Sequence, residues 1–135
     1  MTTLDEHKLK ALAKHLEITV EDAENESDDY LVLTDEEADE MAKDYILESA
    51  WAFRYDFLCG HSKAIAEIPQ KDYEAMAGKL CESFNKAVLS MIDDKEHFIE
   101  DAISCDGRGH FLSSYDGEEN EETIDGETFY IYRTN

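Results

Sequence analysis

The charge of this chain constrains its folding more than any other feature of the sequence. Asp and Glu number 34 against 12 Lys and Arg, which gives a formal net charge of −22 at pH 7. Repulsion among so many carboxylates opposes a compact state. The chain has 135 residues, 42% of them hydrophobic, so one domain of this size can bury a core that offsets the repulsion. We therefore expect a single acidic domain over residues 1–135 rather than a disordered chain.

The same excess of negative charge limits the partners that the protein can bind. Direct binding to nucleic acid is disfavoured because phosphate contacts require Lys and Arg. Binding to an anionic membrane surface is disfavoured for the same reason. A basic protein surface is the natural complement, and association with it is expected to be fast and sensitive to salt. The sequence contains neither a long apolar run nor a signal-peptide pattern, which predicts a cytoplasmic protein.

Helix-start signals and apolar periodicity predict a mainly helical chain with about four helices. The capping-box pattern T-x-x-E occurs at Thr3 and again at Thr34. Apolar residues at helical spacing follow each of these boxes. We therefore predict helices over residues 4–16 and 35–59, and we expect Trp51 in the core.

The remaining helical pattern lies in the second half of the chain. Apolar residues three or four apart predict a third helix over about residues 70–91, directly after Pro69. A shorter fourth helix follows and ends at Gly107, a residue type that commonly stops helices. Residues 17–29, by contrast, are acidic and include Asn, Ser and Asp neighbours, which predicts a loop.

The last thirty residues are strand-like in character. Residues 110–112 and 129–132 are rich in aromatic and β-branched side chains. Asp116-Gly117 and Asp125-Gly126 are dipeptides preferred in tight hairpin turns, and the acidic residues between them form a loop or a weak middle strand. The apolar residues 30–33 read as a strand that can join this sheet. The predicted fold class is α+β, mainly helical, with a small antiparallel β-sheet formed largely by the C-terminal segment.

Two segments of the chain carry a distinctive pattern. One is YLVLTDEEADE at residues 30–40, and the other is DGRGHFLSSYDGEE at residues 106–119, followed by FYIYRTN at residues 129–135. Together they resemble a set of small acidic proteins encoded by bacteriophages and prophages. The resemblance implies a phage setting. By analogy of class and charge, small and very acidic phage proteins resemble DNA and block host defence enzymes, as antirestriction and some anti-CRISPR proteins do.

The first candidate site is an acidic surface. Residues 17–44 contain 13 acidic side chains and one basic one, and residues 116–127 contain seven acidic side chains and no basic one. Side chains three or four apart on a helix lie about 5–6 Å from each other. This spacing is comparable with the roughly 6–7 Å between successive phosphates of a DNA strand. It favours a surface that acts as a DNA mimic; the alternative is a solvated face that only keeps the protein in solution. The candidate residues are Glu26, Asp28, Asp29, Asp35, Glu36, Glu37, Asp39, Glu40, Asp44, Glu118, Glu119, Glu121 and Glu122.

The second candidate site is a set of Arg and Tyr residues in the C-terminal segment. These residue types dominate binding hot spots. The alternative is that the two arginines pair with nearby acids and hold the sheet onto the helices. The residues are Arg108, Tyr115, Tyr130, Tyr132 and Arg133.

Motifs for catalysis are few, and we expect no enzymatic activity, no cofactor and no metal. His97 and Asp101 share a helix face, but a metal site needs further ligands, and Cys105 and His110 match no recognised spacing. The sequence contains no phosphate-binding loop, nucleophile elbow or calcium-binding loop. The three cysteines are widely spaced, which predicts reduced and mostly buried thiols.

These observations together predict a phage-encoded inhibitor of a host defence complex, acting in the host cytoplasm by protein–protein contact. Its expected partner is a basic host protein or nucleoprotein complex, such as a CRISPR effector or a restriction enzyme. Carboxylates would occupy the Lys and Arg side chains that otherwise bind DNA. The alternative is a non-catalytic phage interaction protein that binds another host or phage factor through its C-terminal aromatic and Arg surface.

Overall fold

A computed structural model describes residues 4–135, and the chain divides into two compact units. The first consists of the residues up to Ala42 together with Asp106–Asn135, and we call it the sheet unit. The second consists of Lys43–Cys105, and we call it the helical unit.

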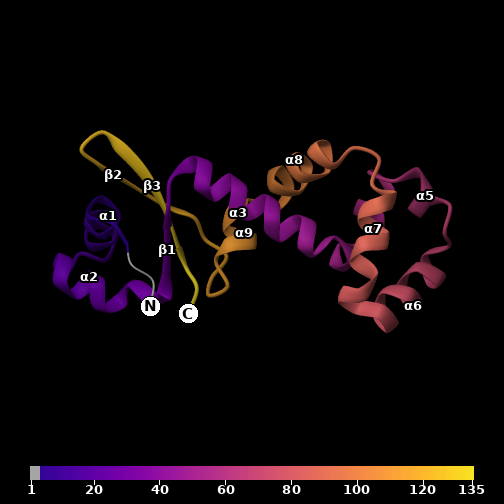
Figure 1. The fold of residues 1–135 in the computed structure, drawn as a ribbon, viewed down its shortest axis with the longest axis horizontal. Helices are drawn as coiled ribbons and strands as arrows, with labels where there is room; N and C mark the ends of the chain where they lie inside the picture. Colours follow the sequence, from indigo (N-terminus) through magenta and orange to yellow (C-terminus); the bar gives the residue numbers. More distant parts are fainter. Residues whose placement is uncertain (1–3) are drawn as a thin grey trace. The chain divides into compact units, whose positions relative to one another are not determined.

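The sheet unit is built around a small antiparallel sheet (Figure 1). The strand order is β1-β3-β2, so the C-terminal strand is central. The elements of this unit are α1 (Glu6–Leu16), α2 (Val20–Glu26), the 3-10 helix η1 (Ser27–Asp29), β1 (Tyr30–Leu33), the first part of α3 (Asp35–Glu48), α9 (Arg108–Leu112), β2 (Asn120–Ile124) and β3 (Glu127–Arg133).

The helical unit contains helices and no strand in its residues 43–105. Its elements are the rest of α3, η2 (Ala50–Ala52), α4 (Tyr55–Cys59), α5 (Lys63–Ala66), α6 (Gln70–Leu80), η3 (Cys81–Phe84), α7 (Asn85–Met91) and α8 (Lys95–Asp106). The predicted α+β class is confirmed: the protein is mostly helical with a three-stranded antiparallel sheet that includes two C-terminal strands. Over residues 4–135, no helix has both the length and the apolar character that crossing a membrane requires.

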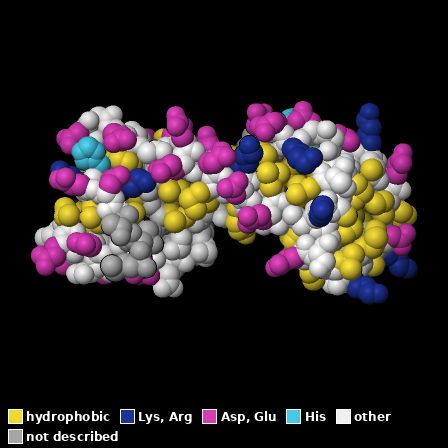
Figure 2. Space-filling model, in the orientation of Figure 1, with side chains coloured by type: hydrophobic (Ala, Val, Ile, Leu, Met, Phe, Trp, Pro, Cys, Tyr) yellow, Lys and Arg dark blue, Asp and Glu magenta, His cyan; other side chains and the backbone are white. Residues whose placement is uncertain are grey.

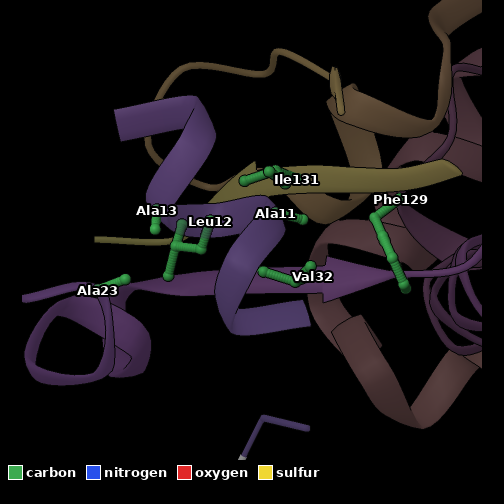
Figure 3. Close-up of a cluster of buried hydrophobic side chains, with 7 residues drawn as sticks. All are labelled: Ala11, Leu12, Ala13, Ala23, Val32, Phe129 and Ile131. Atoms are coloured by element: carbon green, nitrogen blue, oxygen red, sulfur yellow. The ribbon is translucent and has the colours of Figure 1, made fainter. Parts of the chain in front are cut away.

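One face of the sheet packs against α1 and α2 to form the core of the sheet unit (Figure 3). Leu12 of α1 and Ile131 of β3 are fully buried in this core, together with Val32 of β1. Because successive side chains of a strand point to opposite faces, Tyr130 and Tyr132 point to the other face of the sheet. That second face receives the side chains of the candidate site described below.

Local capping signals position two of the helices. Asp5 caps α1, and its side chain accepts a hydrogen bond from the Lys8 backbone N–H at 2.8 Å. Thr3, the predicted cap, lies outside the described residues. At α3 the predicted capping box is confirmed, because the Glu37 N–H donates to Thr34 Oγ1 at 3.2 Å and the Thr34 N–H donates to Glu37 Oε1 at 3.0 Å.

The acidic segment predicted as a loop contains a helix. Thr19 caps α2 by accepting a hydrogen bond from the Asp22 N–H at 3.1 Å. Glu21 and Asp22 lie in the first turn, where carboxylates stabilise a helix through its dipole. Ala23 is fully buried in the core. The loop prediction for residues 17–29 was therefore wrong across Val20–Glu26, where Thr19 caps the helix and Ala23 packs it against the core.

The predicted helix over residues 35–59 is interrupted after Glu48. Asn85 stabilises the interruption: its Oδ1 accepts from the Trp51 N–H at 3.0 Å, and its Nδ2 donates to the Leu47 carbonyl at 2.8 Å. Trp51 consequently lies in η2 and is half-buried, not enclosed in the core as predicted.

The predicted helix over residues 70–91 is also divided. Leu80 is the last residue of α6, and Cys81 follows with φ at 49° and ψ at −128°. A positive φ at a residue with a Cβ is sterically costly and ends the helical hydrogen bonding there. The chain continues through η3 into α7, so one predicted helix is three shorter segments.

The predicted strand at residues 110–112 is helical and belongs to α9. Gly107, with φ at 82°, separates α8 from α9. Gly109 permits a close approach, since a Cβ at this position would lie 2.5 Å from the Gly117 carbonyl oxygen. The dipeptide at Asp116 does not close a hairpin, because it lies in the connection between α9 and β2.

The second predicted hairpin turn is confirmed. Asp125 and Gly126 have φ of 51° and 82°, and Ile124 pairs with Glu127 across the two-residue connection. Positive φ at both central residues is the geometry that suits the twist of a hairpin. The acidic residues before this turn form β2, which is an edge strand and not a middle one.

Truncation of the sheet-unit core is the first test of this fold. We expect Leu12→Ala to lower the free energy of unfolding by about 2–5 kcal/mol, because the removed side chain is fully buried. Urea titration followed by circular dichroism measures the change. Leu80→Ala is the control, since Leu80 is 44% exposed. Equal losses for the two variants would contradict the assignment of this core.

Candidate functional site

Arg108 binds acidic side chains from two other segments of the sheet unit. Its Nη1 donates to Asp35 Oδ1 at 2.8 Å and to Asp39 Oδ1 at 2.9 Å, and its Nε donates to Glu119 Oε1 at 2.8 Å. The Arg108 side chain is only 11% exposed. We call these four residues the Arg108 cluster. Charge-assisted hydrogen bonds of this length are among the stronger polar interactions in proteins.

Two tyrosines of the central strand complete the surroundings of the Arg108 cluster. The Arg108 guanidinium lies 4.6 Å from the centre of the Tyr130 ring, within the range of a cation–π interaction. The Tyr132 hydroxyl donates to the Glu119 carboxylate. Burial, together with this hydrogen bond, raises the pKa of Tyr132, so the hydroxyl remains protonated and acts as a donor. The cluster therefore ties the start of α3 and the segment before β2 to one face of the sheet.

The Arg108 cluster changes the role of three predicted partner-binding acids. Asp35, Asp39 and Glu119 direct carboxylate oxygens at a cation of their own chain. Glu37 is similar, since the Lys8 ammonium lies 2.8 Å from its Oε1 and lowers the pKa of that carboxyl. These four carboxylates stabilise the sheet unit through internal ion pairs, so they are less available for contact with a partner.

The remaining predicted acids differ in exposure. Asp29 and Glu122 are half-buried, and Glu122 lies 4.0 Å from the Lys14 ammonium. Asp28 is exposed, and Asp44 is exposed but belongs to the helical unit. The other five are exposed residues of the sheet unit and make no ion pair within the described chain: Glu26, Glu36, Glu40, Glu118 and Glu121.

The helix α2 presents further exposed carboxylates of the acidic segment 17–44. Glu21, Asp22 and Glu24 are exposed, and within residues 4–135 they make no ion pair. The available signal for this helix in the sequence was Thr19, a residue type that caps helices and here begins α2. We define the unpaired acidic set as Glu21, Asp22, Glu24, Glu26, Glu36, Glu40, Glu118 and Glu121.

The negative charge is divided unevenly between the two units. The sheet unit contains 22 acidic and 5 basic residues, a net charge of −17, whereas the helical unit contains 12 acidic and 7 basic residues, a net charge of −5. In the sheet unit, Lys8, Lys10, Lys14 and Arg108 each pair with an acid of the same unit. Figure 2 shows Asp and Glu side chains across the visible surface of this unit.

The Arg and Tyr candidates are distributed between interior and surface. Tyr132 is fully buried, Tyr130 is half-buried, and the Arg108 guanidinium is occupied by the acids of its own cluster. Arg133 and Tyr115 remain at the surface, with Tyr115 57% exposed. The Arg133 guanidinium lies 3.8 Å from the centre of the Tyr115 ring.

A second polar cluster lies within the helical unit. His61 Nε2 and Asp101 Oδ2 are 2.7 Å apart, and the His61 side chain is only 4% exposed. Its ring packs against those of Phe57, Phe98 and His97 at centroid distances of 4.9, 5.5 and 5.0 Å. Sequence reasoning noticed His97 and Asp101 but missed His61, which no local pattern marks.

The polar cluster of the helical unit is hydrogen-bonded and not arranged as a metal site. Among residues 4–135, no group of three or more His, Cys, Asp or Glu side chains is placed to hold a metal ion. Cys105 Sγ lies 3.6 Å from Asp101 Oδ1, so this carboxylate accepts from both the thiol and the imidazole. Its partners keep Asp101 ionised and hold α8 to the His61 segment. The predicted burial of the thiols was wrong, because Cys81 and Cys105 are exposed and Cys59 is half-buried.

Comparison with models of known protein families, with curated proteins and with solved structures finds no match to this chain.

Loss of the Arg108 guanidinium tests the structural role of the cluster. We expect Arg108→Met to lower the free energy of unfolding by about 2–3 kcal/mol, because three carboxylates lose charge-assisted hydrogen bonds. Arg108→Lys retains the charge without the planar fork, so an intermediate loss is expected. Arg54→Met is the control, since the Arg54 side chain is 88% exposed and its ion pair is 3.8 Å long. Urea titration that gives equal losses at positions 108 and 54 would contradict this role.

The pH dependence of the His61–Asp101 hydrogen bond is a further test. The hydrogen bond from His61 is the largest influence lowering the pKa of Asp101 below its ordinary value of 3.8. A carboxyl with a lowered folded pKa stabilises the protein above its unfolded pKa, and this contribution disappears as the pH falls through the folded pKa. We therefore expect wild type to be more stable than Asp101→Asn at pH 7 and the difference to shrink below about pH 4.

Urea titrations of both proteins at pH 7, 5, 4 and 3 measure this difference directly. Comparing two variants removes the effect of the other carboxylates, which titrate in both. Glu100→Gln is the matched control, because Glu100 is exposed and makes no ion pair in the described part of the chain. A stability difference for Asp101→Asn that stays constant from pH 7 to pH 3 is incompatible with the proposed hydrogen bond.

Proposed function

We propose that this protein is a non-catalytic inhibitor that binds the basic, nucleic acid-binding surface of a partner through the sheet unit. The observation that carries the proposal is the net charge of −17 in that unit, with its lysines and Arg108 already paired internally. Negative charge on a folded surface attracts a positive patch and accelerates encounter. The partner class is a protein whose Lys and Arg side chains otherwise bind phosphates.

The helices α2 and α3 support the DNA-mimic form of this proposal. Glu36 and Glu40 are four residues apart on α3, so their Cβ atoms lie about 5–6 Å apart. On α2, only Ala23 is buried, which leaves its carboxylates exposed to solvent. Both helices offer rows of negative charge at a spacing similar to that of phosphates. No bond-making step is needed, because inhibition follows from occupying the partner's cations.

The resemblance to small acidic phage proteins supports a biological setting for this activity. In that setting the partner is a host defence complex, such as a CRISPR effector or a restriction enzyme. Such complexes hold nucleic acid in positively charged channels. An acidic protein that fills the channel prevents nucleic acid from entering it.

A second candidate function is binding through Tyr115 and Arg133. Tyr115 is the most exposed of the large hydrophobic residues in the described chain, at 57%, and its ring is stacked on the Arg133 guanidinium. Stacked Arg and Tyr side chains are characteristic of binding hot spots. In this form of the proposal, the charge provides solubility and the aromatic contact provides affinity.

Capture of the partner from host lysate tests the proposal. We expect tagged wild-type protein to retain a basic, nucleic acid-binding protein at 0.1 M salt and to release it when duplex DNA is added. At about 1 M salt, the Debye length falls to about 3 Å, so the complex is expected to dissociate. Mass spectrometry identifies the retained protein, and gel-shift assays then measure inhibition of its DNA binding.

Two variants with the same net charge make the test specific. Neutralisation of Glu24, Glu26, Glu36 and Glu40 to Gln in the sheet unit is expected to weaken capture by roughly tenfold or more. The matched control neutralises four exposed acids of the helical unit: Glu48, Glu67, Glu82 and Glu100. Equal weakening by both variants, or retention at high salt, would contradict the proposal. Loss of capture only in the Tyr115→Ala and Arg133→Ala variants would establish the second candidate.

A further inference from the structure

A pocket of about 350 Å³ opens in the helical unit between residues 51–55 and α6. Its walls are largely aromatic, from Trp51, Phe53, Tyr55 and Tyr73. This volume lies at the lower end of the range for ligand sites, roughly 300–1,000 Å³. Figure 2 shows that hydrophobic surface also gathers on the part of the molecule that carries α6 and α7.

Hydrogen bonds and ring contacts fix the aromatic walls. The Trp51 backbone is held by Asn85, and the Tyr55 hydroxyl donates to the Ile68 carbonyl. The Tyr55 and Tyr73 rings lie 5.7 Å apart, and Tyr73 in turn packs against Phe84 at 5.6 Å. These contacts hold the aromatic walls in place without a ligand, which reduces the entropy cost of binding.

The charges at the pocket favour a cation. Arg54 contributes to the lining, but its guanidinium lies 3.8 Å from Asp56 and its side chain is 88% exposed. Glu74 also lines the pocket and has no ion pair within residues 4–135. The uncompensated charge is thus the Glu74 carboxylate. Aromatic faces beside a carboxylate form the type of site that recognises organic cations.

Tyr73 supplies a second, independent indication of an external partner. The residue is only 2% exposed, and over the described chain its buried hydroxyl has no hydrogen-bond partner. Buried polar groups without partners are rare in native proteins and call for a specific explanation. Tyr73 lines the pocket but its hydroxyl is covered, so a cationic N–H group that enters the pocket can donate to the phenolic oxygen only after neighbouring side chains move.

We propose that this pocket binds the guanidinium or ammonium group of an Arg or Lys side chain from the partner protein. The assignment of the cation to the partner protein rests on the proposed function, because that function requires a basic partner. The preference of the pocket for a cation is independent of that function, since it follows from the aromatic walls, the Glu74 carboxylate and the Tyr73 hydroxyl.

Gly78 provides a way to block the pocket without disturbing the helix. It lines the pocket, and a Cβ built at this position meets nothing within 4 Å. Gly78→Leu is therefore expected to fill the pocket while maintaining or raising the thermal stability of the helical unit. Ala75→Leu is the matched control, because Ala75 is an exposed residue of the same helix that does not line the pocket.

Titration of the purified full-length protein tests the chemistry. The probe is Nα-acetyl-arginine methylamide, and its neutral counterpart is Nα-acetyl-citrulline methylamide. Trp51 is the only tryptophan of the chain, so its fluorescence reports directly on the pocket. We expect saturable binding of the arginine probe, at least about fivefold tighter than that of the citrulline probe. Gly78→Leu is expected to abolish the response, and Ala75→Leu to leave it unchanged.

Two further variants assign the polar groups. Glu74→Gln is expected to weaken binding of the arginine probe several-fold without affecting the citrulline probe. Tyr73→Phe is expected to weaken the same binding while leaving the thermal midpoint unchanged or higher, because an unpartnered hydroxyl is removed. Equal binding of the arginine and citrulline probes would overturn the assignment of a cation site. So would binding of p-cresol, an uncharged aromatic probe, without binding of the arginine probe, or a fluorescence response that survives Gly78→Leu.

The source of the cation is tested separately with the captured partner. Gly78→Leu is expected to weaken capture relative to Ala75→Leu, because a basic side chain loses its pocket. If the arginine probe binds but capture is the same in both variants, then the partner's side chain is not the occupant. Failure of the probe titration leaves the proposed function intact, since that function depends on acids of the sheet unit.

Discussion

The Arg108 guanidinium binds carboxylates from separate segments of a chain that contains few basic residues. Asp35 and Asp39 at the start of α3 and Glu119 ahead of β2 all lie 2.8–2.9 Å from its nitrogens. Without a cation between them, these acids would repel one another on the sheet face that carries Tyr130. The planar fork of Arg reaches several carboxylates at once, which a lysine ammonium does with less geometric control. Arg108 therefore links α9 to the start of α3, to the segment before β2 and to the sheet face that carries Tyr130.

Internal pairing of the basic residues of the sheet unit determines which carboxylates remain unpaired on its surface. Lys8 holds Glu37 at the start of α3, and Lys14 reaches both Glu122 and the Thr123 carbonyl on the edge strand. Such contacts stabilise the fold and protect the edge of the sheet from pairing with other chains. They also leave an excess of carboxylates with no internal counter-charge. The acidic surface is thus a consequence of how the few basic residues are distributed, and not only of how many acids there are.

Sequence reasoning succeeded where the determining interactions are local. The Thr34 capping box and the Asp125-Gly126 turn each involve residues within four positions, and both were confirmed. It failed where a distant side chain decides the outcome. Asn85 ends a predicted helix from 34 and 38 residues away. Pairing of Arg108 with acids was one of the two predicted alternatives, but its contacts to α3 span 69 and 73 residues, so the sequence did not show which acids it meets. Because such contacts form only after the chain has folded, local spacing predicted which acids are present but not which of them are already paired.

Charge and aromatic surface serve different purposes in the proposed binding mode. Long-range attraction to the sheet unit increases the rate of encounter with any basic surface, and it does so without distinguishing one basic partner from another. Selectivity requires contacts that depend on shape and hydrogen bonding. The exposed Tyr115 on Arg133 and the pocket beside Trp51 have that character, since both combine aromatic faces with a defined polar group. An inhibitor that used its carboxylates alone would bind many nucleic acid-binding proteins equally well. An inhibitor directed at one partner therefore needs features of the second kind in addition to its charge.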